Sequence, residues 1–286
     1  MTIFCVNPIV NGVRKVFELS YRTWPERWQQ EMTSAKQRRH QGVLEILRET
    51  GKATVNELGM RLGVTEMTIR RDLEMLENDG VLQRFHGGAK LAFGSSYEPP
   101  FPVREKINAD RKRLIGERVA SLIDDGDAII LDGGSTGLAV AEVLVDREVT
   151  VCPLSLRVAW AFARSSTVNL IMPGGSVRPA ELSLSGADTI DYLRGHHFDA
   201  YVMTASGISL QHGFTEWNAD DAAVKKAAVG VADRVVAAVD SSKMNRVGFV
   251  KICGIDVPAA IVTDAEMSAE DLNHLRNQAE DVIVAG

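Results

Sequence analysis

The chain of 286 residues is long enough for about two domains, and its 45% apolar and 24% charged residues are typical of a globular protein. It has neither a run of about 18 apolar residues, as a membrane helix needs, nor an apolar stretch followed by a cleavage site near its N-terminus. Neither a membrane span nor a secretory signal is therefore expected. Cys5, Cys152 and Cys253 lack metal-ligand spacing, so the sequence predicts buried free thiols, no metal site, no cofactor and a cytoplasmic location.

Charge is distributed unevenly along the chain. Residues 33–90 carry ten Lys or Arg and eight Asp or Glu, a net charge of +2, whereas residues 91–286 carry 18 and 27, a net charge of −9. A mildly basic segment before an acidic body is typical of a DNA-binding module joined to a domain that does not bind DNA. An excess of +2 supports this reading only weakly.

Residues 1–32 show no sustained hydrophobic period and end at Met32, directly before a helical pattern. We expect Met32 to be the natural start and residues 1–31 to be an upstream extension. A native flexible N-terminal arm is the alternative.

Residues 33–90 are expected to form a small domain. A first helical stripe of apolar residues stops at Gly51, the extended piece "ATV" follows, and a second short helix ends at Gly63. Thr65 is a suitable N-cap for a third helix, and "VLQRFHGGAKL" predicts two strands that turn at Gly87 and Gly88. This order of elements is that of a winged helix-turn-helix.

Residues 91–106 are predicted to be a linker, because three prolines within "YEPPFPV" oppose a continuous helix or a central strand. From residue 107 to 286, short apolar runs such as "AIILDGG", "VTVCPL" and "DAYVMTA" alternate with helical patterns. Fully apolar strands alternating with helices indicate a largely parallel sheet covered on both faces. The fold class predicted for the chain is therefore α/β, with an N-terminal winged helix-turn-helix joined to a larger α/β domain.

The third helix of the first domain separates an apolar face from a polar one. On a helical wheel Ile69 and Leu73 face inward, whereas Thr68, Arg70 and Arg71 project away from the core near the helix N-terminus. A recognition helix presents side chains to the major groove of DNA from this position, and arginine can bind guanine with two hydrogen bonds. From the spacing alone, a solvated face on which the arginines pair with neighbouring glutamates is equally acceptable.

A resemblance favours the DNA-binding interpretation. The opening Arg39, the stretch "V-T-x-x-T-I-R-R-D-L" and the closing "R-x-H-G-G-A" keep one register over about 50 residues. In this the segment resembles the N-terminal domain of the DeoR/GlpR family of bacterial transcriptional regulators. The resemblance implies that operator DNA is contacted by helix and wing residues, with basic residues flanking them. The predicted DNA-binding residues are Arg39, Thr65, Thr68, Arg70, Arg71, Arg84 and His86.

The second domain carries loops suited to binding an anion. Gly133, Gly134, Ser135 and Thr136 lie between an apolar strand and a helix, where free N–H groups and hydroxyls bind phosphate. The loops "PGGSVR" (173–178) and "DSSK" (240–243) also follow apolar strands, and strand ends of a parallel sheet collect at one edge. A plain turn and a solvated loop remain alternatives for these segments.

The same stretches, from "Y-E-P-P-F" through "I-L-D-G-G-S-T", "G-G-x-x-R" and "D-S-S-K", resemble the effector domain of the DeoR/GlpR family. That domain is similar in fold to ribose-5-phosphate isomerase and typically senses phosphorylated sugars or polyols. The resemblance implies phosphate binding by the glycine-rich turn, positive charge from Arg178, Lys225 and Lys243, and hydroxyl recognition by Asp132 and Asp240. The predicted effector-binding residues are Asp132, Gly133, Gly134, Ser135, Thr136, Gly174, Gly175, Arg178, Ser206, Gly207, Lys225, Asp240 and Lys243. The family commonly has "T-N-S" where this chain has Pro153, Leu154 and Ser155, so its sugar is left open.

The fold resemblance raises an isomerase as the competing hypothesis. Such isomerases carry a "D-G-A-D-E" element after an apolar strand, whereas here the strand "DAYVMTA" continues into Ser206 and Gly207. Asp188, in "SGAD", is more simply an acidic residue at a helix start. We therefore expect no enzyme and no catalytic residues. The expected protein is a cytoplasmic regulator, most simply a repressor, that binds double-stranded operator DNA and a phosphorylated sugar or polyol as a homodimer or homotetramer.

Overall fold

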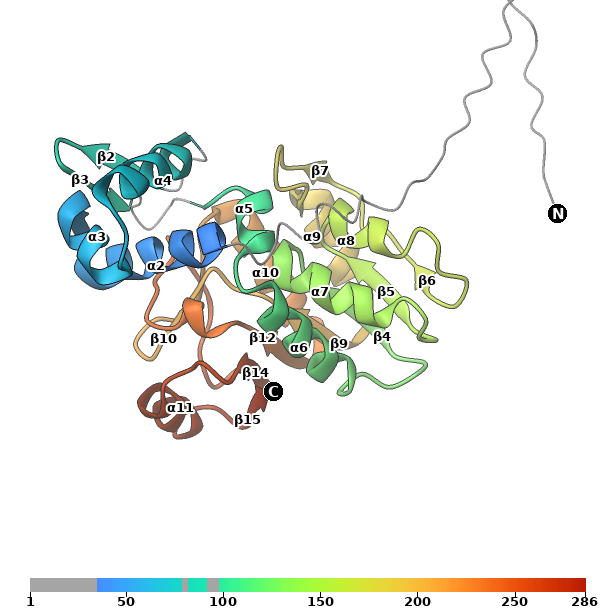
Figure 1. The fold of residues 1–286 in the computed structure, drawn as a ribbon. Coiled ribbons are helices and arrows are strands. Elements are labelled where there is room, and N and C mark those ends of the chain that lie inside the picture. The colour runs from blue at the N-terminus through green and yellow to red at the C-terminus, as the bar shows by residue number, and fades with distance from the viewer. Residues whose placement is uncertain (1–34, 79–81, 92–97) are drawn as a thin grey trace, which may run out of the picture. The chain divides into compact units, whose positions relative to one another are not determined.

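The structure, a computed structural model, describes residues 35–78, 82–91 and 98–286 (Figure 1). The expected N-terminal extension and most of the first half of the predicted linker lie outside these residues. No helix in the described part of the chain is both long enough and apolar enough to span a membrane.

The first domain has the elements expected of a winged helix-turn-helix. Its helices are α2 (Ala35–Thr50), α3 (Val55–Leu62) and α4 (Glu66–Asn78). Its strands are β1 (Lys52–Thr54), β2 (Leu82–Phe85) and β3 (Gly88–Leu91), which form an antiparallel sheet in the order β1-β3-β2. The predicted hairpin turn is present, with Gly87 at a φ of 91°.

Local signals explain where these helices begin and end. Thr54 and Glu57 form a reciprocal capping box at the start of α3, and Gly63 ends this helix in the left-handed conformation at a φ of 65°. The Thr65 hydroxyl accepts a hydrogen bond from the Thr68 N–H at 3.3 Å, which is the capping interaction predicted for α4. The predicted inward residues Ile69 and Leu73 are buried, as is Leu76 one turn further on, together with apolar residues of α2 and α3.

Part of the predicted linker is helical. Helix α5 (Phe101–Lys106) begins directly after Pro100 and contains Pro102 in its first turn. The expectation that the prolines exclude a helix is wrong here, because the first turn of a helix needs no N–H donor from proline and accepts its fixed φ.

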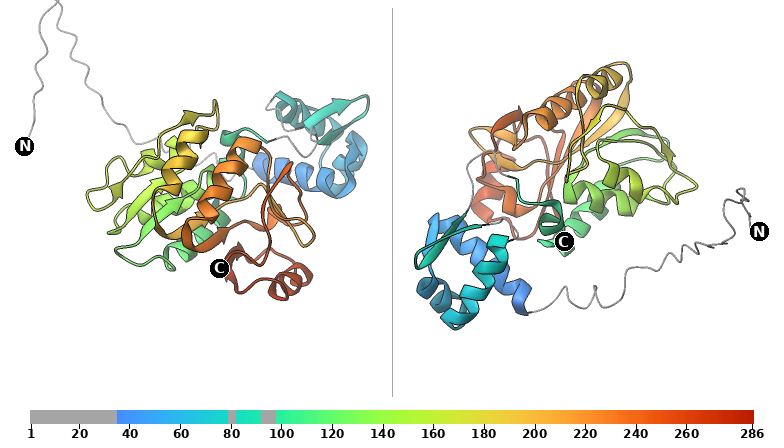
Figure 2. Two further views of the ribbon diagram at one scale, coloured as in Figure 1. Left: turned by 180° about the vertical axis from the view of Figure 1, so that it is seen from behind. Right: turned by 90° about the horizontal axis from the view of Figure 1, so that it is seen from above.

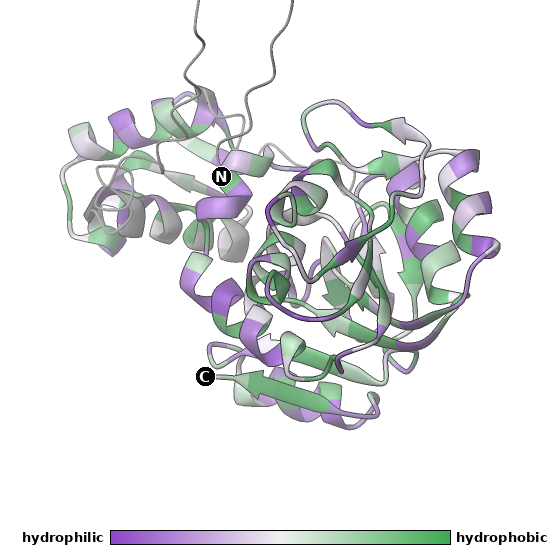
Figure 3. Ribbon diagram, turned by 90° about the vertical axis from the view of Figure 1, so that its right-hand side faces the viewer, coloured by the Kyte–Doolittle hydropathy of each residue, from purple (hydrophilic) through white to green (hydrophobic). Residues whose placement is uncertain are grey.

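The second domain is built on a parallel sheet of seven strands in the order β15-β14-β12-β9-β4-β5-β6. The strands are β4 (Ala128–Leu131), β5 (Thr150–Pro153), β6 (Asn169–Leu170), β9 (Phe198–Met203), β12 (Ala232–Ala238), β14 (Ala260–Asp264) and β15 (Val282–Ala285). They are mostly coloured as hydrophobic in Figure 3. Because the strands are parallel, the carboxyl ends of β4, β9 and β12 lie side by side at one edge.

Helices cover both faces of this sheet, as predicted (Figure 2). One face packs against α6 (Ala109–Ala120), α7 (Gly134–Leu144) and α8 (Leu156–Ala161), and the other against α9 (Ala187–Arg194), α10 (Ala219–Val229) and α11 (Ala269–Arg276). Successive strand residues alternate between the two cores: Ile129 and Leu131 belong to the first and Ile130 to the second. The mixed α/β class predicted from the sequence is confirmed.

Smaller elements extend the second domain. An antiparallel sheet has the order β10-β11-β13, formed by β10 (Gly207–Ser209), β11 (Gly213–Glu216) and β13 (Val250–Cys253). A two-stranded sheet pairs β7 (Ser176–Val177) with β8 (Leu184–Ser185), and a 3-10 turn, η2 (Ser241–Lys243), follows β12. Asp188 lies in the first turn of α9, as the sequence indicated.

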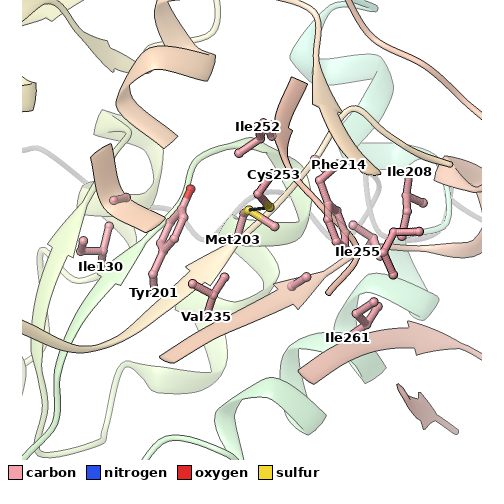
Figure 4. Packing of buried hydrophobic residues seen from close by; sticks show 14 of the residues in the cluster. Ile130, Tyr201, Met203, Ile208, Phe214, Val235, Ile252, Cys253, Ile255 and Ile261 are labelled. Carbon is pink, nitrogen blue, oxygen red and sulfur yellow. Dashed lines mark hydrogen bonds between the residues drawn. The ribbon is translucent and has the colours of Figure 1, made fainter. Parts of the chain in front are cut away.

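Cys152 and Cys253 are free and buried, as expected, while Cys5 lies outside the described residues. The Cys253 sulfur lies 3.9 Å from that of Met203 inside the core drawn in Figure 4. Burial raises the pKa of both thiols to about 12, so neither is reactive as a thiolate at neutral pH. The residues described contain no cluster of His, Cys, Asp and Glu able to hold a metal ion.

Candidate functional site

The polar face of α4 carries exposed cations. Arg70 and Arg71 are both exposed, and the Arg70 guanidinium lies 3.4 Å from the Glu66 carboxylate one turn earlier. The Thr68 hydroxyl lies 3.0 Å from that of Thr65, so both hydroxyls sit at the helix N-terminus. An exposed ion pair within one helix is weak, so a phosphate or a base edge can compete with the glutamate for the arginine.

Arg39 lies in a different environment from the other predicted DNA-binding residues. It lies within α2, and its guanidinium makes a two-point ion pair with Asp72 of α4. His40 Nε2 also lies 3.0 Å from the Asp72 carboxylate, whose side chain is only 2% exposed. Although burial acts to raise it, hydrogen bonds from Arg39 and His40 hold the pKa of Asp72 below its usual value. This arrangement joins α2 to the recognition helix.

The wing places two further predicted residues on the surface. Arg84 and His86 are exposed on the β2–β3 hairpin. The Arg84 backbone N–H donates to Glu77 at 3.0 Å, and its guanidinium lies 3.5 Å from the same carboxylate. This contact attaches the wing to the end of α4. The first domain therefore carries two exposed arginines on its recognition helix and two more basic side chains on its wing.

In the second domain, the glycine-rich turn brings a strand end against a helix start. Gly133 is the N-cap of α7, and the part of the chain that the structure describes provides no side-chain cap for the first N–H groups of this helix. Gly134 has a φ of 78°, and a Cβ there would lie 3.7 Å from the Arg104 guanidinium. A Cβ at Gly137 would lie 2.2 Å from the Asp132 carbonyl oxygen, so α7 packs directly on the end of β4. Such a helix start, with a guanidinium beside it, suits an anion.

Lys225, from α10, lies at the centre of a buried charge cluster. Its Nζ lies 2.9 Å from the Asp132 carboxylate and 2.5 Å from the Glu216 carboxylate, and it also donates to the Thr204 carbonyl at 3.1 Å. Burial alone would lower the pKa of Lys225, but the two carboxylates raise it well above its ordinary value. Burial alone would likewise raise the pKa of Glu216, but Lys225 and hydrogen bonds from Ser206 and Trp217 hold it below its ordinary value. Lys225 and Glu216 are therefore both ionised.

Two arginines lie on the other side of the same pocket. The Arg178 guanidinium lies 2.6 Å from Asp221 and 2.8 Å from Glu98, and the Arg104 guanidinium lies 3.1 Å from Glu98 and pairs with Glu181. The pocket has a volume of about 490 Å³ when the part open to solvent is included. Its charged lining consists of five carboxylates and three cations: Glu98, Asp132, Glu181, Glu216, Asp221, Arg104, Arg178 and Lys225.

The structure gathers some of the predicted effector residues and separates others. The predicted residues that line the pocket are Asp132, Gly133, Gly134, Arg178, Ser206 and Lys225. Those that do not line it are Ser135, Thr136, Gly174, Gly175, Gly207, Asp240 and Lys243. Gly175 has a packing role instead, because a Cβ there would lie 2.0 Å from the Thr189 hydroxyl, and a Cβ at Gly207 would lie 2.4 Å from the Arg246 carbonyl oxygen.

Asp240 and Lys243 form a second cluster at the end of β12. The Asp240 carboxylate accepts hydrogen bonds from Asn108 at 3.0 Å and from the Ser242 N–H at 3.1 Å. Despite burial, the charges of Lys243 and Lys112 and these hydrogen bonds lower the pKa of Asp240 to about 2. Burial lowers the pKa of Lys243 to about 7 against the opposing effect of Asp240. This cluster is at the same sheet edge as Asp132 but separated from it by strand β9.

Several pocket residues were not predicted. Glu98 and Arg104 lie in or next to the predicted linker, and Glu181, Glu216 and Asp221 lie in segments that carry no recognisable motif. The carboxylates that line the pocket come from elements other than the segment after β9, where an isomerase carries its "D-G-A-D-E" element. Their only sequence signal is a set of isolated charges beside apolar strands, which many surface positions share.

These features define a class of protein: a winged helix-turn-helix joined to an α/β domain with a charged pocket at the carboxyl ends of its parallel strands. The family model of the DeoR-like helix-turn-helix domain matches residues 39–93, and that of the DeoR C terminal sensor domain matches residues 107–265. The chain belongs to the DeoR family of transcriptional regulators.

Full-length relatives agree with this membership. A glycerol-3-phosphate regulon repressor of Escherichia coli (strain K12) is 29% identical over 228 residues, which are 79% of this chain and 90% of the relative. The HTH-type transcriptional repressor GlcR of Bacillus subtilis (strain 168) is 30% identical over 222 residues, 78% of this chain and 86% of the relative. A solved ribose 5-phosphate isomerase A from Methanocaldococcus jannaschii is 18% identical with a TM-score of 0.37, covering 48% of this chain and 55% of that one. A likeness of this degree carries no conclusion about activity.

Proposed function

We propose that this regulator is a repressor whose operator binding is controlled by a phosphorylated sugar or polyol bound in the pocket at the ends of β4 and β9. The observation that carries the proposal is the start of α7, where N–H groups without a side-chain cap lie beside Arg104. A helix N-terminus with an adjacent guanidinium is suited to a phosphate group. The relatives that are named as repressors, one of them of a glycerol-3-phosphate regulon, support the proposal.

The DNA-binding part follows from the face of α4. Arg70, Arg71 and Thr68 would reach the major groove, while Arg84 and His86 of the wing would lie over the adjacent backbone. Arg39 would act indirectly in this arrangement, by holding Asp72 and thereby the angle of α4. Recognition of two half-sites would require at least a dimer, as a homodimer or a homotetramer in the cytoplasm.

Sugar-hydroxyl recognition would come from the polar groups that line the same pocket. Ser206 and Thr204 carry hydroxyls there, and Asp132 and Lys225 lie next to them. Leu154 lines the pocket where the family commonly has an asparagine, so it would offer the ligand an apolar contact at that point. The second cluster, at Asp240 and Lys243, would contribute only if the ligand extends along the sheet edge past β9.

A sensor is favoured over an isomerase by the state of the carboxylates. A general base needs a carboxylate with a free lone pair and a pKa near the working pH. Asp132 and Glu216 are instead both held by Lys225, and Glu216 accepts further hydrogen bonds from Ser206 and Trp217. The depressed pKa of Glu216 also opposes proton abstraction. The competing isomerase hypothesis predicts turnover of ribose 5-phosphate, which a direct assay at high protein concentration would detect.

The test is a gel-shift assay with DNA from upstream of the protein's own gene and neighbouring genes. We expect a specific complex that one member of a panel of phosphorylated sugars and polyols weakens, while the unphosphorylated form of the same compound has no effect. A complex that persists unchanged through the whole panel would contradict the sensor part of the proposal. Absence of any specific complex would contradict the operator-binding part.

A further inference from the structure

Glu98 occupies a place in the pocket that an anionic ligand would take. Its carboxylate bridges two guanidinium groups, at 3.1 Å from Arg104 and 2.8 Å from Arg178, and its side chain is only 14% exposed. Two guanidinium groups converging on one carboxylate make the arrangement with which proteins bind phosphate monoesters. Glu98 also lies seven positions after Leu91, the last residue of the wing strand β3.

The charge of the pocket opposes the entry of an anionic ligand. Five carboxylates and three cations line it, so its net formal charge is already negative before any ligand enters. Two unit charges at about 4 Å repel by about 4 kcal/mol at the effective dielectric typical near a protein surface. A phosphate dianion therefore needs one of the carboxylates to leave or to be neutralised.

Among the five carboxylates, Glu98 is the one best suited to leave. Asp132 accepts hydrogen bonds from the backbone N–H groups of Gly133 and Thr204, and Glu216 accepts one from Trp217. Asp221 accepts one from the Ser183 hydroxyl and is part of helix α10, which fixes its backbone. These groups are held by elements of the sheet domain itself.

No such anchor holds Glu181 or Glu98 among the described residues, and of these two only Glu98 bridges both guanidinium groups. Glu181 pairs with Arg104 alone. Burial raises the pKa of Glu98 against the opposing effect of Arg104, which indicates that the carboxylate is not strongly stabilised where it lies. Arg104 also lies beside Gly134 at the start of α7, so the position of the Glu98 carboxylate and the helix N-terminus border the same space.

We propose that Arg104 and Arg178 form the anion subsite for the phosphate of the ligand, and that Glu98 occupies this subsite until the ligand displaces it. The inference rests on the proposed function and adds a route by which ligand binding changes the chain outside the pocket. Displacement frees the chain at Glu98, three positions before helix α5, and this chain leads to the DNA-binding domain. A ligand that binds only when Glu98 has left shifts the equilibrium between two states of the linker.

The test compares the full-length protein with Glu98→Gln, which keeps the shape of the side chain and removes its charge. Calorimetric titration with inorganic phosphate, and with the phosphorylated sugar panel, is expected to give tighter binding to Glu98→Gln by about five- to ten-fold, within the usual range of coupling between sites. Glu105→Gln is the matched control, because Glu105 is exposed on helix α5, seven positions after Glu98, does not line the pocket and carries the same charge. It should bind phosphate as the unaltered protein does.

A second measurement, hydrogen exchange, reports whether the chain around helix α5 is released. Hydrogen exchange of the backbone N–H groups of Val103 and Arg104, which bond to the Pro100 carbonyl, should become faster when the unaltered protein binds the ligand. In Glu98→Gln exchange should already be faster without the ligand, and in Glu105→Gln it should not. A Glu98→Gln variant that binds phosphate with unchanged or lower affinity overturns the inference while leaving the proposed function intact. Failure of every phosphorylated compound to bind either protein overturns both.

Discussion

The polar face of α4 that carries Thr68, Arg70 and Arg71, here called the recognition face, and the pocket of the second domain both contain cations. The cations of the recognition face are exposed, whereas those of the pocket are buried in ion pairs. The Arg70 side chain is 58% exposed and has one weak partner on its own helix. Lys225 and Arg104 are 9% and 13% exposed, and each pairs with carboxylates that come from other elements. The arginines of the recognition face are therefore accessible to an anion from solution, whereas the cations of the pocket are already paired with carboxylates of the protein.

This difference has a direct energetic consequence. An exposed cation costs little to leave unpaired, because water solvates it, and salt screens its interactions. A buried cation that loses its partner remains desolvated, and the cost is several kilocalories per mole. Changes in the pocket should therefore alter the stability of the fold, whereas changes on the recognition face should alter DNA affinity alone.

The largest effect is expected for Lys225→Met. This change leaves the Asp132 and Glu216 carboxylates buried together without a cation. The free energy of unfolding should fall by about 3–5 kcal/mol, as when one partner of a buried ion pair is removed. Chemical denaturation followed by circular dichroism measures this. Lys226→Met, at the exposed neighbouring lysine, is the control and should change stability by less than about 0.5 kcal/mol. Equal losses of stability in the two variants would contradict the description of Lys225 as the centre of a buried charge cluster.

A smaller loss of stability is expected for Asp72→Asn. The variant loses the charged hydrogen bonds from Arg39 and His40 that join α2 to α4. Because hydrogen bonds to charged groups contribute about 1.5–3 kcal/mol, the first domain should lose stability of this order. Operator affinity should fall as well, since α4 loses the contact that fixes its angle. Glu74→Gln, at an exposed position of the same helix, should change neither property. Unchanged stability of Asp72→Asn would show that Arg39 serves another purpose.

Arg71→Ala should affect DNA binding and leave stability unchanged. Loss of one arginine contact to a base or a phosphate costs about 1–3 kcal/mol, or roughly ten-fold or more in affinity. Fluorescence anisotropy with labelled upstream DNA measures it, at several salt concentrations. Arg194→Ala, at an exposed arginine of α9, removes the same charge from the other domain and is the control. If both variants weaken binding equally, net charge and not the recognition face would explain the affinity.

The smallest effect is a dependence of stability on acid pH. Burial acts to raise the pKa of Asp72, but Arg39 and His40 hold it below the value it has when unfolded. The unfolded chain therefore binds the proton first, and the contribution of Asp72 is complete above the ordinary aspartate pKa of about 3.9 and is lost as the pH falls below it. The stability difference between the unaltered protein and Asp72→Asn should shrink over that range. A difference that stays constant down to pH 2 would contradict this assignment.

The contrast between the two regions also explains how much the sequence could predict. The recognition helix is a local structure, so the 3.6-residue period placed Ile69 and Leu73 inside and Arg71 outside. Thr65 marked its start, and Gly63 marked the end of the helix before it. The glycine turn after β4 was likewise visible as a local signal. The pairing of Arg39 with Asp72 joins residues 33 positions apart, and no local period reveals it.

The pocket could be predicted only in part for the same reason. Arg104 pairs with Glu181 at a separation of 77 positions, and Arg178 pairs with Glu98 at a separation of 80. These contacts depend on the order of strands in the sheet, which determines the loops that meet at its edge. Helix α5 was missed because proline was treated as a helix breaker at positions where the first turn accepts it.

The measurement that tests the account most directly is the affinity for the phosphorylated effector with and without operator DNA. We propose that the effector weakens DNA binding, and linkage then requires that DNA weaken effector binding by the same factor. The account predicts equal factors from the two titrations for the unaltered protein. It also predicts a smaller dependence on effector for Glu98→Gln, whose linker is already released. An effector that binds with the same affinity whether or not DNA is present would contradict the account.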